Sequence, residues 1–198
     1  MLALLLFCFL LSFQQAFSEI KLTRVNATDR LEVVLVHGSK EARMDHVHAY
    51  QFCKNLTNYL NITSTKVDPY LSDMLSVHDH LLMHEVIMPG ILKVIDEIFW
   101  IGGMYKVVEG HHHRQFSVSK WTDRSPFTLK YFHQGHFNRH HHIRLGDRFC
   151  IIIAFNSGRW DLRPCNEKLF FACQIIKSNM PIDAPRHEKP LKSPYDKD

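Results

Sequence analysis

The sequence predicts a single α+β domain in which helices and antiparallel strands are joined by disulfide bonds. The first observation is the region 147–177, where two apolar runs, 151–155 and 169–176, flank a turn at Gly158-Arg159-Trp160. Short runs of this kind, bounded by turn residues, are typical of strands, and we expect the two strands to be adjacent. The second observation is a helical spacing of apolar residues at Ala49, Cys53, Leu56 and Leu60. The third is size, because 198 residues with 45% hydrophobic composition suit one core.

The N-terminal residues 1–18 have the composition of a secretory signal peptide. They contain no charged side chain, and about a dozen apolar residues precede small residues at Ala16 and Ser18. The run is shorter than the ~20 residues that a membrane span needs, so we expect cleavage after Ser18 and a secreted, extracellular protein. Because no basic residue follows Met1, a retained anchor is the alternative. No later apolar stretch is long enough to span a membrane.

The remaining stretches are assigned in chain order. Residues 19–30 form a polar N-terminal lead-in, and Leu31 to Val36 an opening strand. Residues 71–94 have a helical pattern that Pro89-Gly90 should end or kink. From 177 to 198 the chain carries half of its eight prolines, many charges and almost no large apolar residues, which predicts a disordered C-terminal tail.

Cysteines and glycosylation sequons agree with an extracellular compartment. Cys8 leaves with the signal peptide, and four cysteines remain: Cys53, Cys150, Cys165 and Cys173. Four cysteines allow three pairings, among which the sequence alone does not choose. Asparagine sequons occur at Asn26, Asn55 and Asn61. Asn55 lies about 200° around the predicted helix from Cys53, so we expect it to face solvent and to carry a glycan.

Charge and motifs exclude two classes of function. The net charge of +4 is mild, and no basic stripe with interleaved aromatic residues indicates nucleic-acid binding. The sequence contains no G-x-S-x-G, H-E-x-x-H or C-x-x-C motif. We therefore expect a binding protein and no enzyme.

Three sequence elements together resemble the C-type lectin-like domain family. They are Phe99-Trp100-Ile101-Gly102-Gly103, Trp121-Thr122-Asp123-Arg124-Ser125-Pro126-Phe127, and a Gly-x-Trp that precedes a C-x7-C pair. The resemblance covers residues 31–176. It implies a double-loop domain with two helices, antiparallel sheets and two disulfides, which join Cys53 to Cys173 and Cys150 to Cys165.

The resemblance also implies sugar binding, which many family members achieve through calcium. Their calcium ligands come from Glu-Pro-Asn or Gln-Pro-Asp in the long loop, from Trp-Asn-Asp, and from an acidic residue near the cysteine. Here the corresponding triplets are His136-Phe137-Asn138 and Trp160-Asp161-Leu162, and Asp147 precedes Cys150. The candidate ligand-binding residues are His136, Asn138, Trp160 and Asp161, although the resemblance also implies that Trp160 packs in the core under the loop. Calcium takes six to eight oxygen ligands, and only Asn138, Asp161 and Asp147 offer oxygen, so the calcium site is degenerate.

Histidine is unusually frequent in the interval where the family places its long loop. Of 15 histidines, eight lie here: His111, His112, His113, His133, His136, His140, His141 and His142. Zinc is the candidate metal, with His111, His113, His140 and His142 as ligands, since neighbouring histidines on an extended segment point to opposite faces. Solvated histidine-rich loops are the alternative. His80 and His84 form a weaker i, i+4 pair without a third ligand.

The sequence thus predicts a secreted C-type lectin-like recognition module that binds carbohydrate with a degenerate calcium site. The alternative is a module that binds a host, immune or cell-surface protein and no sugar. No cofactor is certain for either interpretation, since the calcium site is degenerate and zinc is only a candidate. The partner in both is extracellular, a glycan or a protein.

Overall fold

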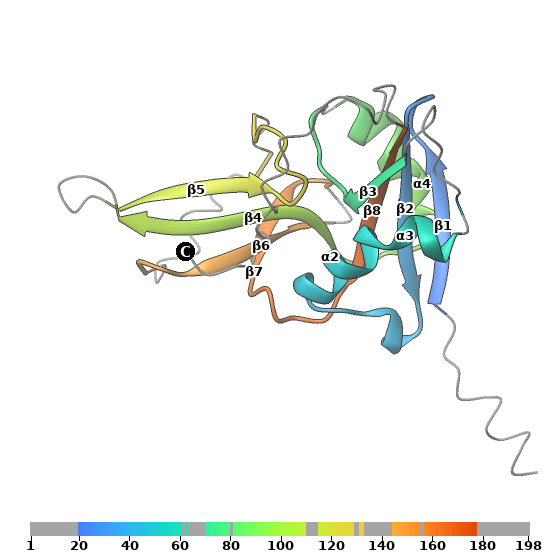
Figure 1. Ribbon diagram of the computed structural model, residues 1–198. Helices are drawn as coiled ribbons and strands as arrows, with labels where there is room; N and C mark the ends of the chain where they lie inside the picture. Colours follow the sequence, from blue (N-terminus) through green and yellow to red (C-terminus); the bar gives the residue numbers. More distant parts are fainter. Residues whose placement is uncertain are drawn as a thin grey trace, which may run out of the picture.

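The computed structural model describes residues 20–60, 62, 70–79, 81–109, 115–128, 131–132, 144–154 and 157–177. Eight strands and several short helical segments follow one another in these ranges (Figure 1). In chain order they are β1 (Ile20–Asn26), β2 (Leu31–Gly38), η1 (Lys40–Ala42), α2 (His46–Lys54), α3 (Leu56–Tyr59), β3 (Tyr70–Met74), η2 (Leu82–Ile87), α4 (Met88–Leu92), β4 (Phe99–Glu109), β5 (Gln115–Trp121), β6 (Arg148–Ile153), β7 (Trp160–Arg163) and β8 (Phe170–Lys177).

The strands form one sheet in the order β1-β2-β8-β4-β6-β7, with β3 paired to β8 and β5 paired to β4. All pairs are antiparallel except β4 and β8, which run parallel where Phe99 faces Phe170 and Trp100 faces Phe171. The expected strands at 151–155 and 169–176 exist as β6 and β8, but their predicted adjacency is wrong because β4 lies between them. The start of β4 is apolar on both faces, as a strand covered on both sides requires.

The segment expected to be a polar lead-in is strand β1. It pairs with β2 along its whole length, from Ile20 opposite Gly38 to Asn26 opposite Glu32. Arg24 and Glu32 form an ion pair across the two strands, so the charges that suggested a lead-in lie on the exposed face of the sheet. Val25, the next residue along the strand, points to the opposite face and packs against the core there.

The helical pattern at 71–94 is correct only in its second half. Residues 70–74 form β3 against β8, and the helical segment begins after Asp79, whose carboxylate accepts the N–H groups of Leu81 and Leu82. The segment then passes through Pro89 and ends at Leu92. The turns before Pro89 are π-helical, and this wider turn accommodates a proline whose ring would clash with the carbonyl four residues earlier in a regular α-helix.

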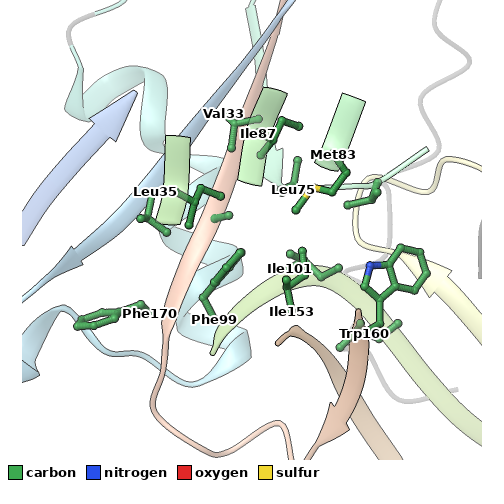
Figure 2. Close-up of a cluster of buried hydrophobic side chains, with 14 of the residues drawn as sticks. Val33, Leu35, Leu75, Met83, Ile87, Phe99, Ile101, Ile153, Trp160 and Phe170 are labelled. Atoms are coloured by element: carbon green, nitrogen blue, oxygen red, sulfur yellow. The ribbon is translucent and has the colours of Figure 1, made fainter. Parts of the chain in front are cut away.

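Apolar side chains fill both faces of the sheet. One cluster joins the sheet to η2 and α4, and Figure 2 shows Leu75, Met83 and Ile87 converging on Phe99 and Ile101. The other cluster lies under α2, with these fully buried members among others: Val34, Val36, Ala49, Cys53, Leu56, Trp100 and Phe171. The predicted helical face of α2 and α3 is thereby confirmed.

Both predicted disulfides are present. Cys53 of α2 joins Cys173 of β8, with Cα atoms 5.3 Å apart, and Cys150 of β6 joins Cys165, with Cα atoms 5.0 Å apart. The first bond attaches α2 to the strand that pairs with β2, β3 and β4, so it fixes the helix on the sheet. Asn55, just after α2, is exposed as expected.

His46, the first residue of α2, is fully buried beneath β4. Its Nε2–H donates to the carbonyl of Ile101 at 2.8 Å, and its ring packs edge-on to Trp100 with ring centres 5.4 Å apart. Burial in this apolar contact lowers the pKa of His46 to about 4. The imidazole is therefore neutral at physiological pH and serves as a hydrogen-bond donor inside the core.

Among the described residues, no helix is both long and apolar enough to cross a membrane.

Candidate functional site

The predicted site residues divide into those that the structure describes and those that it does not. Trp160, Asp161 and Asp147 are described. The following lie outside the described residues: His111, His113, His136, Asn138, His140 and His142, together with His80, Asn61 and residues 1–18 and 178–198. The predicted zinc and carbohydrate contacts at those positions therefore remain predictions. The structure describes where the second histidine-rich segment begins, at residues 121–128 and 131–132; these residues and the strand residues that hold them are called the loop base below.

Trp160 is a core residue at the centre of an aromatic cluster. Its side chain has no exposed surface, and its ring centre lies 5.4 Å from that of Trp121, 5.7 Å from Phe127 and 5.6 Å from Phe132. The prediction that Trp160 contacts a ligand is not supported by this placement. Trp121 is the last residue of β5, and Phe127 and Phe132 come from the segment that follows it, so Trp160 anchors that segment to the sheet.

The oxygen atoms of the predicted calcium site are engaged locally. Asp161 accepts the N–H of Leu162 at 2.9 Å, and Asp147 accepts the N–H of Arg144 at 2.7 Å. Leu162 is 2% exposed and belongs to the core. Within the described part of the chain, no three side chains of His, Cys, Asp or Glu come together as metal ligands would.

Thr122 fixes the start of the segment that follows β5. Its hydroxyl donates to Asp73 of β3 at 2.7 Å, and its N–H donates to the carbonyl of Gly102 at 2.9 Å. A Cβ atom on Gly102 would lie 2.6 Å from the Thr122 hydroxyl and 3.1 Å from the Cβ of Met74. Gly102 in the Trp-Ile-Gly-Gly element is thus required for the close approach of Thr122 to β3.

Asp123 ties the next turn to the last strand. One carboxylate oxygen accepts the N–H and the hydroxyl of Ser125, and the other accepts the side-chain amide of Gln174 at 2.9 Å. The Gln174 carbonyl in turn accepts the N–H of Ser76 at 2.9 Å, and Gln174 is only 2% exposed. Between these contacts Arg124 has a φ of +64°, a left-handed conformation that residues other than glycine rarely adopt. Backbone strain of this kind is often found at functional sites.

Asp73 is the buried charge beneath this loop base. Burial raises the pKa of Asp73, while the hydrogen bond from Thr122 and the ammonium of Lys54, 3.4 Å away, oppose that rise. The side chain of Asp73 is 9% exposed. Donors from two elements thus hold one buried carboxylate in place, which makes the base of the loop a rigid support.

Tyr131 and Arg159 form a partly accessible pair at the loop base. The Arg159 guanidinium lies 5.1 Å from the centre of the Tyr131 ring, and the N–H of Trp160 donates to the Tyr131 carbonyl at 2.7 Å. His84 packs edge-on to Tyr131 with ring centres 5.1 Å apart. Both Tyr131 and Arg159 are half-buried. A cation stacked on an aromatic ring offers a flat apolar face and hydrogen-bond donors together.

Sequence reasoning missed four residues of this base: Asp73, Gln174, Tyr131 and Arg159. Asp73 could have been noticed because it is the charged residue within the largely apolar run 71–77, and buried carboxylates are rare without partners. Gln174, beside Cys173, gave a similar signal. No sequence signal identified Tyr131 and Arg159, because only the fold brings these two residues together.

The sheet order, the two disulfides and the buried tryptophans at the loop base are those of a C-type lectin-like fold. The structure is similar to human lithostathine, at 18% identity and a TM-score of 0.51, over 78% of this chain and 97% of that chain. It is also similar to the C-type lectin CEL-I from Cucumaria echinata, at 12% identity and a TM-score of 0.51, over 78% of this chain and 96% of that chain. No family model and no curated protein matches the sequence. At these identities the similarity establishes the fold.

Proposed function

We propose that this protein is a secreted recognition module that binds carbohydrate at the face formed by the loop base, without a tight calcium site. The observation that supports it is the rigid base itself, in which Thr122 and Asp123 are fixed to β3 and β8 while Tyr131 and Arg159 stay partly accessible. Pre-ordered side chains reduce the conformational entropy lost when a ligand binds.

The calcium part of the proposal follows from the ligand set. In calcium-binding proteins of this fold, the triplet that corresponds to Trp160-Asp161-Leu162 supplies two side-chain oxygen ligands. Here Leu162 offers no oxygen and is buried. Asp161 supplies one carboxylate, which also accepts a backbone N–H. Sugar would then be held by hydrogen bonds and by stacking on an aromatic ring, as at Tyr131.

A glycan array probed with the full secreted protein tests this proposal, once with calcium and once with EDTA. We expect equal binding to the same glycans under both conditions, and weaker binding by Arg159→Gln. Arg163→Gln is the matched control, because Arg163 is an exposed arginine on the neighbouring strand β7. Binding that disappears in EDTA would contradict the calcium-independent mechanism.

Protein recognition is the second candidate function. Val118 on β5 is 41% exposed and Leu145, in the turn before β6, is 46% exposed. Both lie on the arm formed by β4, β5 and β6, which projects from the body of the sheet in Figure 1. A protein partner that packs against this arm would bury both side chains. Two results together would support this function instead. The glycan array would show no binding, and the wild-type protein would capture an extracellular protein that the Val118→Ser variant does not retain.

A further inference from the structure

One face of the arm formed by β4, β5 and β6 gathers basic side chains (Figure 1). The strand register places Lys106 of β4 directly opposite Arg148 of β6. Lys120 of β5 is the diagonal neighbour of Lys106, and Arg163 of the adjoining strand β7 is the diagonal neighbour of Arg148. Because alternate residues of a strand project to the same face, these four cations share one face, which we call the basic face.

The strand geometry sets the spacing of these charges. Residues directly opposite each other in antiparallel strands have Cβ atoms about 5 Å apart, and diagonal neighbours are about 7–8 Å apart. The strands are adjacent in the order β5-β4-β6-β7, so spacings of about 4.8 Å spread the charges over about 14 Å. Like charges opposite each other destabilise a sheet, and an anion that lies between them removes this repulsion.

The cations of the basic face are accessible to a ligand. Lys120, Arg148 and Arg163 are exposed, and Lys106 is half-buried. The three exposed cations form no salt bridge with any carboxylate in the part of the chain that the structure describes. A ligand therefore meets their charged ends without first displacing a partner.

Carboxylates do not balance the charge of the basic face. The four strands contain two acidic residues, Glu109 and Asp161. Glu109 is three residues from Lys106 on the same strand and therefore projects to the opposite face. Asp161 shares the basic face, two residues from Arg163, and accepts the N–H of Leu162 at 2.9 Å. Four positive charges are thus set against one carboxylate, which gives this face a positive potential.

The spread of the charges favours a chain-like anion over a small one. At separations of about 5–8 Å, a single small anion contacts one or two of the cations. A polymer with repeated anionic groups can cross the strands and contact all four. Arginine binds oxyanions through its planar fork of N–H donors, and lysine binds them as a point charge.

The two disulfide bonds narrow the class of polymer. Disulfides persist in oxidising compartments, above all outside the cell. Sulfated polysaccharides are the abundant anionic polymers there, whereas anionic lipids are concentrated in the cytoplasmic leaflet of the membrane. The chemistry of the basic face and the compartment together point to sulfate groups on a polysaccharide.

We propose that the basic face binds a sulfated polysaccharide, which runs across β5, β4, β6 and β7. This surface goes beyond the function proposed above, because the two sites lie on opposite faces of the same strands. Trp121 and Trp160 of the loop base belong to the core cluster on one face, and Cys150, beside Arg163, belongs to the cluster on the other.

Calorimetry of the full secreted protein with heparin tests this proposal, in EDTA at pH 7.5, where most histidines are neutral. Between 50 and 200 mM salt the Kd should rise about tenfold or more, because binding releases counterions from the polyanion. Arg148→Gln should raise the Kd about fivefold, the upper end for an exposed charge contact. Combining it with Lys106→Gln should raise the Kd about tenfold or more. Arg30→Gln and Lys93→Gln are matched controls, because both residues are exposed outside the arm, and neither should change the Kd.

The melting temperature separates lost binding from lost folding. Replacing either of the two opposed cations should leave it unchanged or raise it, since a like-charge repulsion is removed. An equal Kd for the double variant and the two controls would overturn the basic face as the binding surface. Fully desulfated heparin that binds as tightly as heparin would overturn the recognition of sulfate. Tighter binding of oligodeoxythymidylate or polyglutamate would overturn the choice of a polysaccharide.

The glycan array distinguishes this proposal from that of the loop base. Arg163→Gln should weaken binding to sulfated glycans and leave binding to uncharged glycans unchanged, whereas Arg159→Gln should weaken binding to uncharged glycans. Binding to uncharged glycans without any binding to heparin would support the loop base and overturn the basic face.

Discussion

Acid should destabilise this protein through His46 before it protonates most carboxylates. The folded protein keeps His46 neutral, with a pKa of about 4, whereas an exposed histidine in the unfolded chain has a pKa near 6.5. The folded pKa is lowered, so the unfolded state binds the additional proton first as the pH falls. The contribution of His46 to stability is therefore complete above pH 6.5 and is lost as the pH falls to 4.

The size of the effect follows from the difference between the two pKa values. One pKa unit corresponds to about 1.4 kcal/mol, so the free energy of unfolding should fall by about 2 kcal/mol between pH 6.5 and 5. By pH 4 the loss should reach about 3 kcal/mol. Burial also lowers the pKa of His37, with the nearby Lys21 as a second cause, and that histidine adds a smaller loss over the same pH range.

Urea unfolding at pH 7, 6, 5 and 4 measures this loss, with His46→Gln as the comparison. Glutamine can donate to the Ile101 carbonyl but does not titrate, so the variant should lose much less stability on acidification. His48→Gln is the matched control, because His48 is exposed on the same helix. Equal pH dependence in wild type and His46→Gln would refute the assignment to His46.

The remaining predictions concern the two disulfide bonds, the binding of calcium and zinc, and the hydrogen bonds of the loop base. Non-reducing peptide mapping should find both disulfides, and Cys53→Ala should lower the free energy of unfolding by about 2–5 kcal/mol. Millimolar calcium should barely change the melting temperature; low-micromolar affinity by calorimetry would contradict this. If zinc binds, its affinity should fall from pH 7 to 5, because each histidine must lose its proton to coordinate the metal. Replacing the histidines at 111–113 and 140–142 with serine should abolish zinc binding. Equal zinc binding by the wild type and this variant would show that these histidines are not the ligands. Thr122→Val should cost about 1.5–3 kcal/mol in urea unfolding, because buried Asp73 loses a donor, whereas the exposed Thr128→Val should cost little.

The sequence predicted the parts of the fold that local pattern or family resemblance determines. The face of α2 followed from spacing, and the disulfide between Cys53 and Cys173 followed from resemblance. The position of β4 between β8 and β6 could not be predicted, because strand order depends on pairing between residues far apart in the chain. β1 was missed because its charges lie on the exposed side of an edge strand, where they resemble a polar linker.

The candidate site was predictable to a smaller extent. The resemblance located Asp161 and implied that Trp160 lies in the core, but it did not identify the aromatic partners of Trp160. Those partners are Trp121, Phe127 and Phe132, which only the folded chain brings together. The hydrogen bonds of Asp73 were equally invisible, because its partner Thr122 is 49 residues away. Local sequence carries no information on such contacts.

The place of β8 in the sheet has a consequence for how the protein is made. β8 is the last strand in the described part of the chain, yet it pairs with β2, β3 and β4 and carries Cys173, 120 residues after its partner Cys53. A ribosome-bound chain that lacks this strand therefore leaves β2 and β3 without their shared neighbour and Cys53 without its partner. Folding of the sheet must wait until synthesis has passed Lys177, and the long-range pairing makes it slow. During that interval the free thiols and unpaired strand edges are exposed, so aggregation and incorrect disulfide pairing compete with folding until β8 is added.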